Sequence, residues 1–322
     1  MNSNETYEKE LSFQVDRRRA TVELIKIISD LWYDKTVELV LFRNQLIDRN
    51  VSEILSLIEY AKEFVQKPIS IFDTVEIAKK IQELDLPPAK IDLGKLDYIY
   101  HLVGEKNIGE FVTEKLKDAK KSNGFQPKDV ILYGFGRIGR LLARELMSKT
   151  GKGKQMRLRA IVVRGEITPE VLEKRAAMLR NDSVHGNFSG SVKADFMSKS
   201  LIVNETKVHV ISAEQPENID YTKYGIENAL VIDNSGAFRT KEALSRHLKA
   251  KGVQKVLLTA PGKEVPNIVY GVNHFEIDPD KIDIVSAASC TTNAITPILK
   301  VIEDNFEVVN GHLETIHAYT ND

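Results

Sequence analysis

The segment Asp129–Arg140 reads DVILYGFGRIGR, and it decides the fold of the second half of the chain. Its first five residues form a short apolar run that predicts a buried strand. Gly134, Gly136 and Gly139 then fit the pattern G-x-G-x-x-G, and a helical stretch follows. A strand, a glycine turn and a helix in this order are typical of a site that holds the pyrophosphate of a dinucleotide. A purely structural strand-to-helix turn is the alternative, and the sequence context favours the dinucleotide.

Each glycine of this turn has a separate physical task in that interpretation. Gly134 permits the tight turn, Gly136 lets the backbone approach the anion, and Gly139 lets the helix pack closely on the strand. The N-terminus of the helix adds free N–H donors and a positive dipole end. We therefore predict that this turn binds a cofactor.

Short apolar runs and helical stretches alternate along the rest of this half. The further strands are expected at residues 158–163, 229–232, 256–258 and 284–286, and the helices at 137–147 and 240–249. This alternation predicts an α/β fold, a Rossmann-type doubly wound and mostly parallel sheet with helices on both faces. Residues 191–211 interrupt the alternation and predict antiparallel strands inserted into the unit.

The first 127 residues differ in composition, since they hold 4 of the 18 glycines and 1 of the 7 histidines. Apolar residues recur at helical spacing within Leu24–Trp32 and Ile54–Val65, which predicts an all-α domain. Asn50 or Ser52 is expected to cap the second of these helices, and Glu53 stands at the capping-box distance from Asn50. A self-contained bundle and an oligomerisation or regulatory domain are equal alternatives for its role.

Three domains follow from these patterns. We expect a helical N-terminal extension over residues 1–127, a dinucleotide-binding domain over 128–288, and the beginning of an α+β catalytic domain over 289–322. The turn-forming segment Ser122–Pro127 is the expected linker. A length of 322 residues allows two or three domains of ordinary size.

The overall composition excludes several classes of protein. A net charge of −1 gives no general attraction to nucleic acid or to an anionic membrane. The single cysteine excludes a disulfide scaffold and a multi-cysteine zinc or iron–sulfur site, and we predict no metal site. The polar start is unlike a signal peptide, and no apolar run is long enough to span a bilayer. A cytoplasmic location is the expectation.

The residue after the second strand bears on the identity of the cofactor. A carboxylate there would bind the ribose hydroxyls of NAD, whereas this chain has Arg164 followed by Gly165 and Glu166. An arginine at this position suits the 2′-phosphate of NADP. NADP is slightly favoured over NAD, with Glu166 as an alternative ribose ligand and a solvent-facing Arg164 as the plain alternative.

The only cysteine lies in the segment Ser289–Asn293, which reads SCTTN. This segment follows an expected strand and precedes a helical stretch, which places Cys290 at a helix N-terminus, where the dipole favours a thiolate. The neighbouring hydroxyls either cap the helix or bind phosphate. Taken alone, a lone cysteine is more often a buried and inert residue.

Six motifs in the same order make the chain similar to a known family. They are GFGRIGR (134–140), NDSVHGNFSG (181–190), APGK (260–263), GVNH (271–274), SCTTN (289–293) and IHAYTND (316–322). Over residues 128–322 the chain resembles phosphorylating glyceraldehyde-3-phosphate dehydrogenase. The helical first half has no counterpart in the ordinary family member.

The resemblance implies a role for each matching residue. Cys290 stands where the family has its nucleophile, and His317 where it has its general base. Ser289, Thr291 and Thr320 match positions that bind the phosphate of the substrate and the attacking phosphate. The cofactor-binding residues that the resemblance implies are Gly134, Gly136, Arg137, Ile138, Gly139, Arg164, Ser235 and Thr259.

The implied activity is the oxidation of glyceraldehyde 3-phosphate to an acyl phosphate through a cysteine thioester, in glycolysis or gluconeogenesis. NAD or NADP and inorganic phosphate are the implied co-reactants. A homotetramer is implied as well, with no nucleic acid or membrane partner. Erythrose-4-phosphate dehydrogenase is a close alternative, and a non-catalytic nucleotide-binding regulatory protein is an alternative of another class.

The chain departs from the family pattern at several positions. Tyr133 stands where the family has asparagine before the glycine turn, Ala287 where it has asparagine before the thiol, and Arg164 where it has an acid. The family's catalytic domain also continues beyond the last motif, whereas this chain ends at Asp322. We expect an incomplete chain that is inactive by itself.

Overall fold

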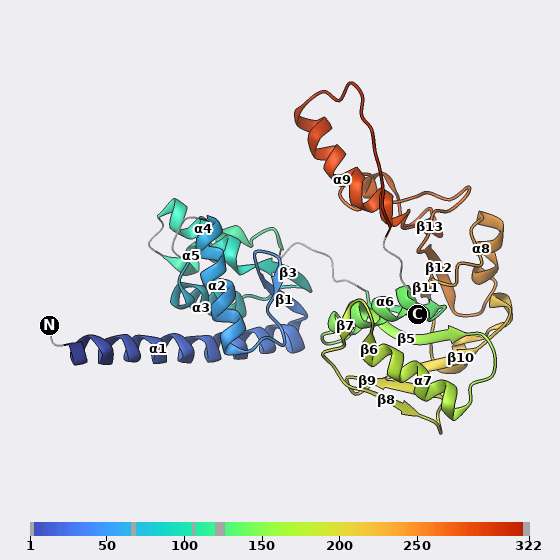
Figure 1. Ribbon diagram of the computed structural model, residues 1–322, viewed down its shortest axis with the longest axis horizontal. Coiled ribbons are helices and arrows are strands. Elements are labelled where there is room, and N and C mark those ends of the chain that lie inside the picture. Colours follow the sequence, from blue (N-terminus) through green and yellow to red (C-terminus); the bar gives the residue numbers. More distant parts are fainter. Residues whose placement is uncertain (1–2, 66–68, 105–106, 120–125, 318–322) are drawn as a thin grey trace. The chain divides into compact units, whose positions relative to one another are not determined.

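The computed structural model describes residues 3–65, 69–104, 107–119 and 126–317 (Figure 1). The chain divides into two compact units. The first contains residues 1–126 and 151–155, and the second contains residues 127–150 and 156–322. Most of the expected linker, Ser122–Pro127, lies outside the described residues. The three domain boundaries expected from the sequence stay predictions.

The first unit is mainly helical, as the sequence predicts. Its helices are α1 (Ser3–Asp30), α2 (Val51–Val65), α3 (Ile71–Glu83), α4 (Leu93–Val103) and α5 (Ile108–Lys115), and α1 continues into a π-helical turn over Leu31–Lys35. The capping box before α2 is confirmed. The Asn50 N–H donates to Glu53 Oε2 at 2.8 Å, and the Glu53 N–H donates to Asn50 Oδ1 at 3.0 Å. A cap of this kind contributes about 1 kcal/mol.

A small sheet is the feature of this unit that the prediction of an all-α domain missed. Strand β1 (Val37–Leu41) lies between β2 (Asn44–Gln45), which is antiparallel to it, and β3 (Ala89–Asp92), which is parallel to it. All five side chains of β1 are buried. The run VELVL is too short to distinguish a strand from a helix by periodicity, and its parallel partner comes about fifty residues later. The pairing is therefore fixed by tertiary contacts that no local pattern displays.

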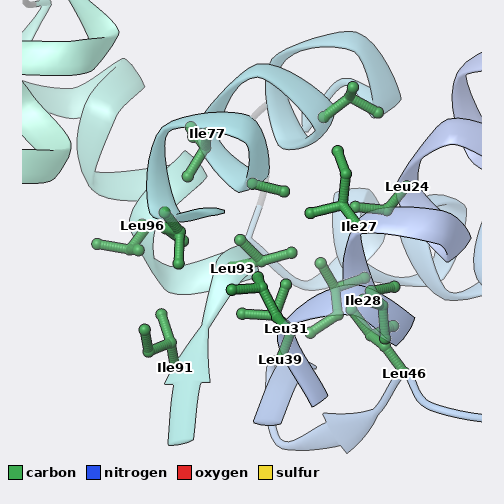
Figure 2. Packing of buried hydrophobic residues seen from close by; sticks show 14 of the residues in the cluster. Leu24, Ile27, Ile28, Leu31, Leu39, Leu46, Ile77, Ile91, Leu93 and Leu96 are labelled. Atoms are coloured by element: carbon green, nitrogen blue, oxygen red, sulfur yellow. The ribbon is translucent and has the colours of Figure 1, made fainter. Parts of the chain in front are cut away.

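The core of the first unit lies between the helices and this sheet. Figure 2 shows leucine and isoleucine side chains from α1, α3 and α4 meeting those of β1 and β3. The labelled members from these elements are nearly all fully buried, for example Leu24, Ile77 and Leu93 at 1%, 0% and 0% exposure. The helical spacing seen in the sequence thus marks the buried faces of α1 and α2.

The second unit is built on an eight-stranded sheet in the order β13-β12-β11-β4-β5-β10-β9-β8. The parallel strands are β4 (Lys128–Tyr133), β5 (Met156–Val163), β10 (Thr206–Ser212), β11 (Ala229–Asp233), β12 (Val253–Leu258) and β13 (Ile284–Ser286). Read in chain order, these six have the arrangement 3-2-1-4-5-6, which is that of the doubly wound dinucleotide-binding fold. The predicted fold class is confirmed.

The interruption predicted at residues 191–211 is present in altered form. Strands β8 (Val192–Asp195) and β9 (Ser200–Val203) pair antiparallel with each other, and β9 pairs antiparallel with β10. β10 itself pairs parallel with β5, so it is the third strand of the parallel set and not an insertion. A two-stranded hairpin of β6 (Asn181–Asp182) and β7 (Gly186–Asn187) precedes them.

Helices cover both faces of the sheet. Alternate residues of β4 point to opposite sides, so that Val130 and Leu132 pack with α6 (Arg137–Ser148) and α7 (Pro169–Arg180). Ile131 and Tyr133 pack on the other side with α8 (Lys241–Leu248). The strand that leads into the glycine turn is therefore fixed by a buried layer on each face of the sheet.

The last helix, α9 (Cys290–Asn305), has no buried residue. Apolar side chains on it and after it are exposed, and they include Ile298, Leu299, Val301, Ile302, Phe306 and Val309. Residues 307–317 form no strand. Among the described helices of the chain, none combines the length and the apolar character that crossing a membrane needs.

Candidate cofactor and thiol site

A pocket opens where the carboxyl ends of three parallel strands meet. Tyr133 ends β4, Val163 ends β5, and Asn234 and Ser235 follow β11, and all four line the pocket together with the glycine turn. Its position is the switch point of the sheet: β5 lies on one side of β4, and β11, which the chain reaches only after β10, lies on the other. Open α/β sheets bind their ligands at this point.

The glycine turn has the geometry that an anion site needs. Gly134 has φ +98°, and a Cβ on it would lie 2.8 Å from the Ser235 nitrogen. A Cβ on Gly139 would lie 2.5 Å from the Gly134 carbonyl oxygen, whereas a Cβ on Gly136 would meet nothing within 4 Å. The space beside Gly136 is therefore open on the side from which a ligand can approach.

The N-terminus of α6 supplies donors to that space. Gly136 is the N-cap residue, and it makes no side-chain cap. The first-turn N–H groups thus retain their capacity to bind an anion, and the helix dipole adds partial positive charge. The residues present fit the pyrophosphate of a dinucleotide.

Two arginines line the same pocket, Arg164 after β5 and Arg175 on α7. Arg164 is exposed, while Arg175 is partly buried and donates from Nη1 to the Phe135 carbonyl oxygen at 3.3 Å. Burial and the nearby Arg140 lower the pKa of Arg175. The lining includes no carboxylate. Sequence reasoning missed Arg175, because nothing in the pattern of α7 marks which residue faces the turn.

The other residues predicted to bind the cofactor differ in their placement. Ser235 lines the pocket. Ile138 is 52% exposed on the first turn of α6. Arg137 donates from Nη2 to Ser183 Oγ at 3.1 Å. Thr259 donates from Oγ1 to the Asp233 carbonyl oxygen at 3.0 Å and is not among the lining residues.

Asp182 ties the glycine turn to the β6–β7 hairpin. Its carboxylate accepts the N–H groups of Val184 and His185 at 3.0 and 2.9 Å. Its other oxygen lies 3.5 Å from Arg137 Nε and 3.5 Å from Arg140 Nη2, both on α6. The His185 N–H, the other hydrogen bonds and Arg137 hold the pKa of Asp182 well below its usual range. The motif NDSVHG thereby has a structural task that its sequence does not display.

A second buried carboxylate holds the loop on the opposite side of the pocket. Asp233 is fully buried at the end of β11, and its Oδ1 accepts the Ser235 N–H at 2.8 Å and the Ser235 hydroxyl at 2.7 Å. Its Oδ2 lies 2.8 Å from Nε2 of His247, which is 1% exposed on α8. The ring of Tyr133 meets that of His247 edge-on, with centroids 4.7 Å apart.

This cluster explains the tyrosine before the glycine turn. Burial and the nearby Asp233 raise the pKa of Tyr133, so its phenol stays neutral. His247 is a buried packing residue whose ring also pairs with the Asp233 carboxylate. In the sequence, the signal that could have indicated this cluster is Asp233, an acidic residue at the end of an apolar strand.

The thiol lies at the first residue of α9, as predicted. Ser289 caps this helix, since its Oγ accepts the Thr292 N–H at 3.0 Å. The Asn293 side chain donates to the carbonyl oxygens of Ala287 and Ser289 at 2.7 and 2.9 Å, and this fixes the turn before the cysteine. Within that turn Ala288 has φ +58°, a strained value for a residue other than glycine. Cys290 is exposed.

The structure brings His317 to the N-terminus of α9. Its Nε2 lies 3.4 Å from Oγ1 of Thr291, the residue that follows the thiol. Thr320, predicted to bind phosphate, lies outside the described residues. Because β13 is parallel to β12 and leads to α9, Cys290 lies at the same edge of the sheet as the glycine turn. The hydroxyl of Ser289 serves as a helix cap, and its predicted contact with phosphate remains a prediction.

Two family models match the second half of the chain. Residues 128–241 match the model described as glyceraldehyde 3-phosphate dehydrogenase, NAD binding domain. Residues 289–322 match the C-terminal domain of the same family. The family predicted from the motifs is confirmed, and so is a nicotinamide dinucleotide, NAD or NADP, as the cofactor of that family.

Similar proteins fall into two groups by how much of this chain they match. A glyceraldehyde-3-phosphate dehydrogenase-like protein from Pseudomonas aeruginosa is 45% identical over 306 residues, which is 93% of this chain and 66% of the relative. Glyceraldehyde-3-phosphate dehydrogenases from Ogataea parapolymorpha and Thermotoga maritima are 39% and 37% identical over 60% of this chain. The chain spans 53% and 54% of their lengths. The Pseudomonas match is long enough to include most of the helical unit.

Replacing the buried Asp182 by asparagine is expected to lower the free energy of unfolding by about 3 kcal/mol at pH 7, because a buried negative charge 3.5 Å from Arg137 and Arg140 is removed. The folded-state pKa of Asp182 is depressed. Its contribution is therefore present above the unfolded-state pKa, near 4, and is lost as the pH falls further. Urea unfolding at several pH values checks this, with the exposed Glu227→Gln as control. An equal loss at pH 7 and pH 2.5 would contradict it.

Proposed function

The chain belongs to the glyceraldehyde-3-phosphate dehydrogenase family, and from this membership we propose that it carries the cofactor site and the thiol of a phosphorylating aldehyde dehydrogenase. The proposed reaction oxidises glyceraldehyde 3-phosphate, with inorganic phosphate, to an acyl phosphate. The observation that supports it most is the placement of His317 beside the N-terminus of α9. His317 contacts Thr291, the residue that follows Cys290. The proposed location is the cytoplasm, and the proposed pathway is glycolysis or gluconeogenesis.

The thiol performs the covalent steps of this proposal. The Cys290 sulfur, as thiolate, attacks the aldehyde carbon and forms a C–S bond, while the carbonyl oxygen becomes an oxyanion. Loss of a hydride from that carbon, with its two electrons, converts the adduct to a thioester. An oxygen of inorganic phosphate then attacks the carbonyl carbon, the C–S bond breaks, and the thiolate is regenerated.

Two groups at the helix end assist these steps. His317 accepts the proton of the Cys290 thiol and afterwards donates that proton to the oxyanion. Thr292 N–H and Asn293 N–H already donate to Ser289. The N–H groups of Cys290 and Thr291 are then the first-turn donors for which no described residue is an acceptor, and they are placed to stabilise the oxyanion.

The cofactor is held by the glycine turn in this proposal. The first-turn N–H groups of α6 bind the pyrophosphate, and Gly136 leaves room for it. When bound, NAD or NADP accepts the hydride. Arg164 and Arg175 face the pocket without a carboxylate among the lining residues, and this favours NADP, whose 2′-phosphate an arginine can bind with two hydrogen bonds.

The exposed apolar surface of α9 indicates which form of the protein is active. Since no residue of α9 is buried, the thiol lies on a helix whose apolar side chains face solvent. Burial of such a face holds a catalytic helix in one position. We therefore propose that the 322-residue chain alone is inactive and that the active form is a homo-oligomer in which this surface is covered.

In the active homo-oligomer proposed above, Cys290→Ser is expected to lower kcat by at least about 1,000-fold, because the hydroxyl is a far weaker nucleophile. His317→Gln should lower kcat by about 100-fold or more, because the proton acceptor is lost. The assay follows NADH or NADPH formation with glyceraldehyde 3-phosphate and with erythrose 4-phosphate. His312→Gln is the matched control, since His312 is exposed and pairs only with Glu314 among the described residues.

Three results of that assay separate the alternatives. A preference for erythrose 4-phosphate would replace the substrate but keep the mechanism. If neither aldehyde reduces either cofactor and Cys290→Ser changes nothing, the dehydrogenase proposal is wrong. Binding of NADPH to the homo-oligomer without any turnover would favour a regulatory nucleotide-binding protein.

The two glycines of the turn separate folding from cofactor binding. Gly136→Ala should leave the melting temperature within about 1 °C of the parent and weaken NADPH binding roughly tenfold, because the new methyl group occupies only ligand space. Gly139→Ala should lower stability by about 2 kcal/mol, because its Cβ meets the Gly134 carbonyl oxygen. Differential scanning fluorimetry and NADPH fluorescence measure the two effects. Equal effects of both substitutions on stability would contradict the assignment of Gly136.

Arg164→Ala tests the choice of cofactor. Loss of a charge-assisted hydrogen bond of about 2 kcal/mol should weaken NADPH binding about 30-fold and change NADH binding less than about twofold. Lys193→Ala removes one exposed positive charge on β8 and is the control. If Arg164→Ala weakens both cofactors equally, the arginine does not bind a 2′-phosphate.

A further inference from the structure

Three side chains that bind metals in other proteins converge between α3 and α4 of the helical unit. Asp73 lies on the first turn of α3, and Asp97 and His101 lie four residues apart on one face of α4. One ligand atom from each residue lies within 4.8 Å of the other two. This cluster belongs to the first compact unit, whereas the glycine turn and the thiol belong to the second. The proposed dehydrogenase activity does not use the cluster.

The distances around the imidazole fit the spacing of ligand atoms around a metal ion. His101 Nε2 lies 3.1 Å from Asp97 Oδ1 and 3.3 Å from Asp73 Oδ2. A tetrahedral zinc ion with bonds of about 2.1 Å holds neighbouring ligand atoms about 3.4 Å apart. Asp73 is 36% exposed, so its carboxylate has space to adjust to an ion.

Two buried atoms of the cluster point to a ligand. Asp97 has no exposed surface, yet its Oδ1 makes no hydrogen bond of acceptable geometry with any described residue. The buried Nε2 of His101 likewise makes no hydrogen bond of acceptable geometry with any described residue, although it lies only 3.1 Å from Asp97 Oδ1. A buried carboxylate oxygen without a hydrogen bond is costly, and a bound cation removes that cost.

The remaining oxygen of Asp97 is held in place by its neighbour. Thr74 Oγ1 donates to Asp97 Oδ2 at 2.8 Å and also to the Ser70 carbonyl oxygen at 2.9 Å. This contact leaves Oδ1 turned toward His101. Outer hydrogen bonds of this kind orient the ligands of metal sites.

From these contacts we propose that Asp73, Asp97 and His101 bind a divalent transition-metal ion, with Zn²⁺ as the preferred ion. One imidazole nitrogen and two carboxylate oxygens suit Zn²⁺ better than Ca²⁺ or Mg²⁺, which prefer oxygen ligands only. Three protein ligands leave a fourth position for water or for a further group. The ion joins α3 to α4, so it stabilises the helical unit.

Zinc binding to the 322-residue chain tests this proposal. All samples carry Cys290→Ser, because the exposed thiol near His317 is itself capable of binding Zn²⁺. Equilibrium dialysis against buffered Zn²⁺, followed by elemental analysis, should give one ion per chain. The melting temperature should rise with the Zn²⁺ concentration, because the ion binds the folded state. Co²⁺ in place of Zn²⁺ should give the visible absorption of a tetrahedral N/O site.

Variants locate the ion within the chain. His101→Gln and Asp73→Asn should each weaken Zn²⁺ binding at least about tenfold and abolish most of the thermal shift. Because Asp73 is partly exposed, the Asp73→Asn variant is expected to fold. It therefore tests the proposal even if variants at the buried Asp97 do not fold. His312→Gln removes an exposed histidine beside one carboxylate and should leave binding unchanged.

Either of two results would overturn the proposal. If the parent binds no Zn²⁺ at a free concentration of about 10 µM, the cluster is only a group of close polar contacts between His101 and two carboxylates and holds no metal. If His101→Gln and Asp73→Asn bind one ion as tightly as the parent, the metal lies elsewhere.

Discussion

The close approach of α6 to the end of β4 is the constraint on which the second unit depends. Gly139 lies against the Gly134 carbonyl oxygen so closely that a single added carbon would be 2.5 Å from it. That packing directs the first turn of α6 at the switch point between β4 and β11. The position of the N–H donors at the pocket depends on this contact, because it sets how closely the first turn of α6 approaches the end of β4.

Two buried carboxylates hold the loops around that contact. Asp182 joins α6 to the β6–β7 hairpin, and Asp233 joins the loop after β11 to His247 on α8. Asp233 is partnered by an N–H group, a hydroxyl and a ring nitrogen. Asp182 accepts two N–H groups and lies 3.5 Å from two arginines, so both carboxylates have partners inside the protein. They act on opposite sides of the glycine turn. The rigidity of the proposed cofactor site thus comes from residues outside its lining.

Strong local patterns in the sequence predicted much of the fold. The glycine turn, the parallel strands and the start of α9 each have a residue pattern that local chemistry imposes, and they were predicted correctly. The sheet of the helical unit was missed, because β1 and β3 pair across about fifty residues. Arg175, Asp182 and the Asp73–Asp97–His101 cluster were missed for the same reason. Their partners lie on other elements, and one sequence holds no record of those contacts.

The central claim is that a nicotinamide dinucleotide binds at the carboxyl ends of β4, β5 and β11. Hydrogen–deuterium exchange of the 322-residue chain with and without NADPH tests it most directly, because exchange reports each amide separately. The account predicts slower exchange at residues 134–139 and 233–236 and no change in α3 and α4. Unchanged exchange at residues 134–139 with saturating NADPH, or protection confined to the helical unit, would contradict it.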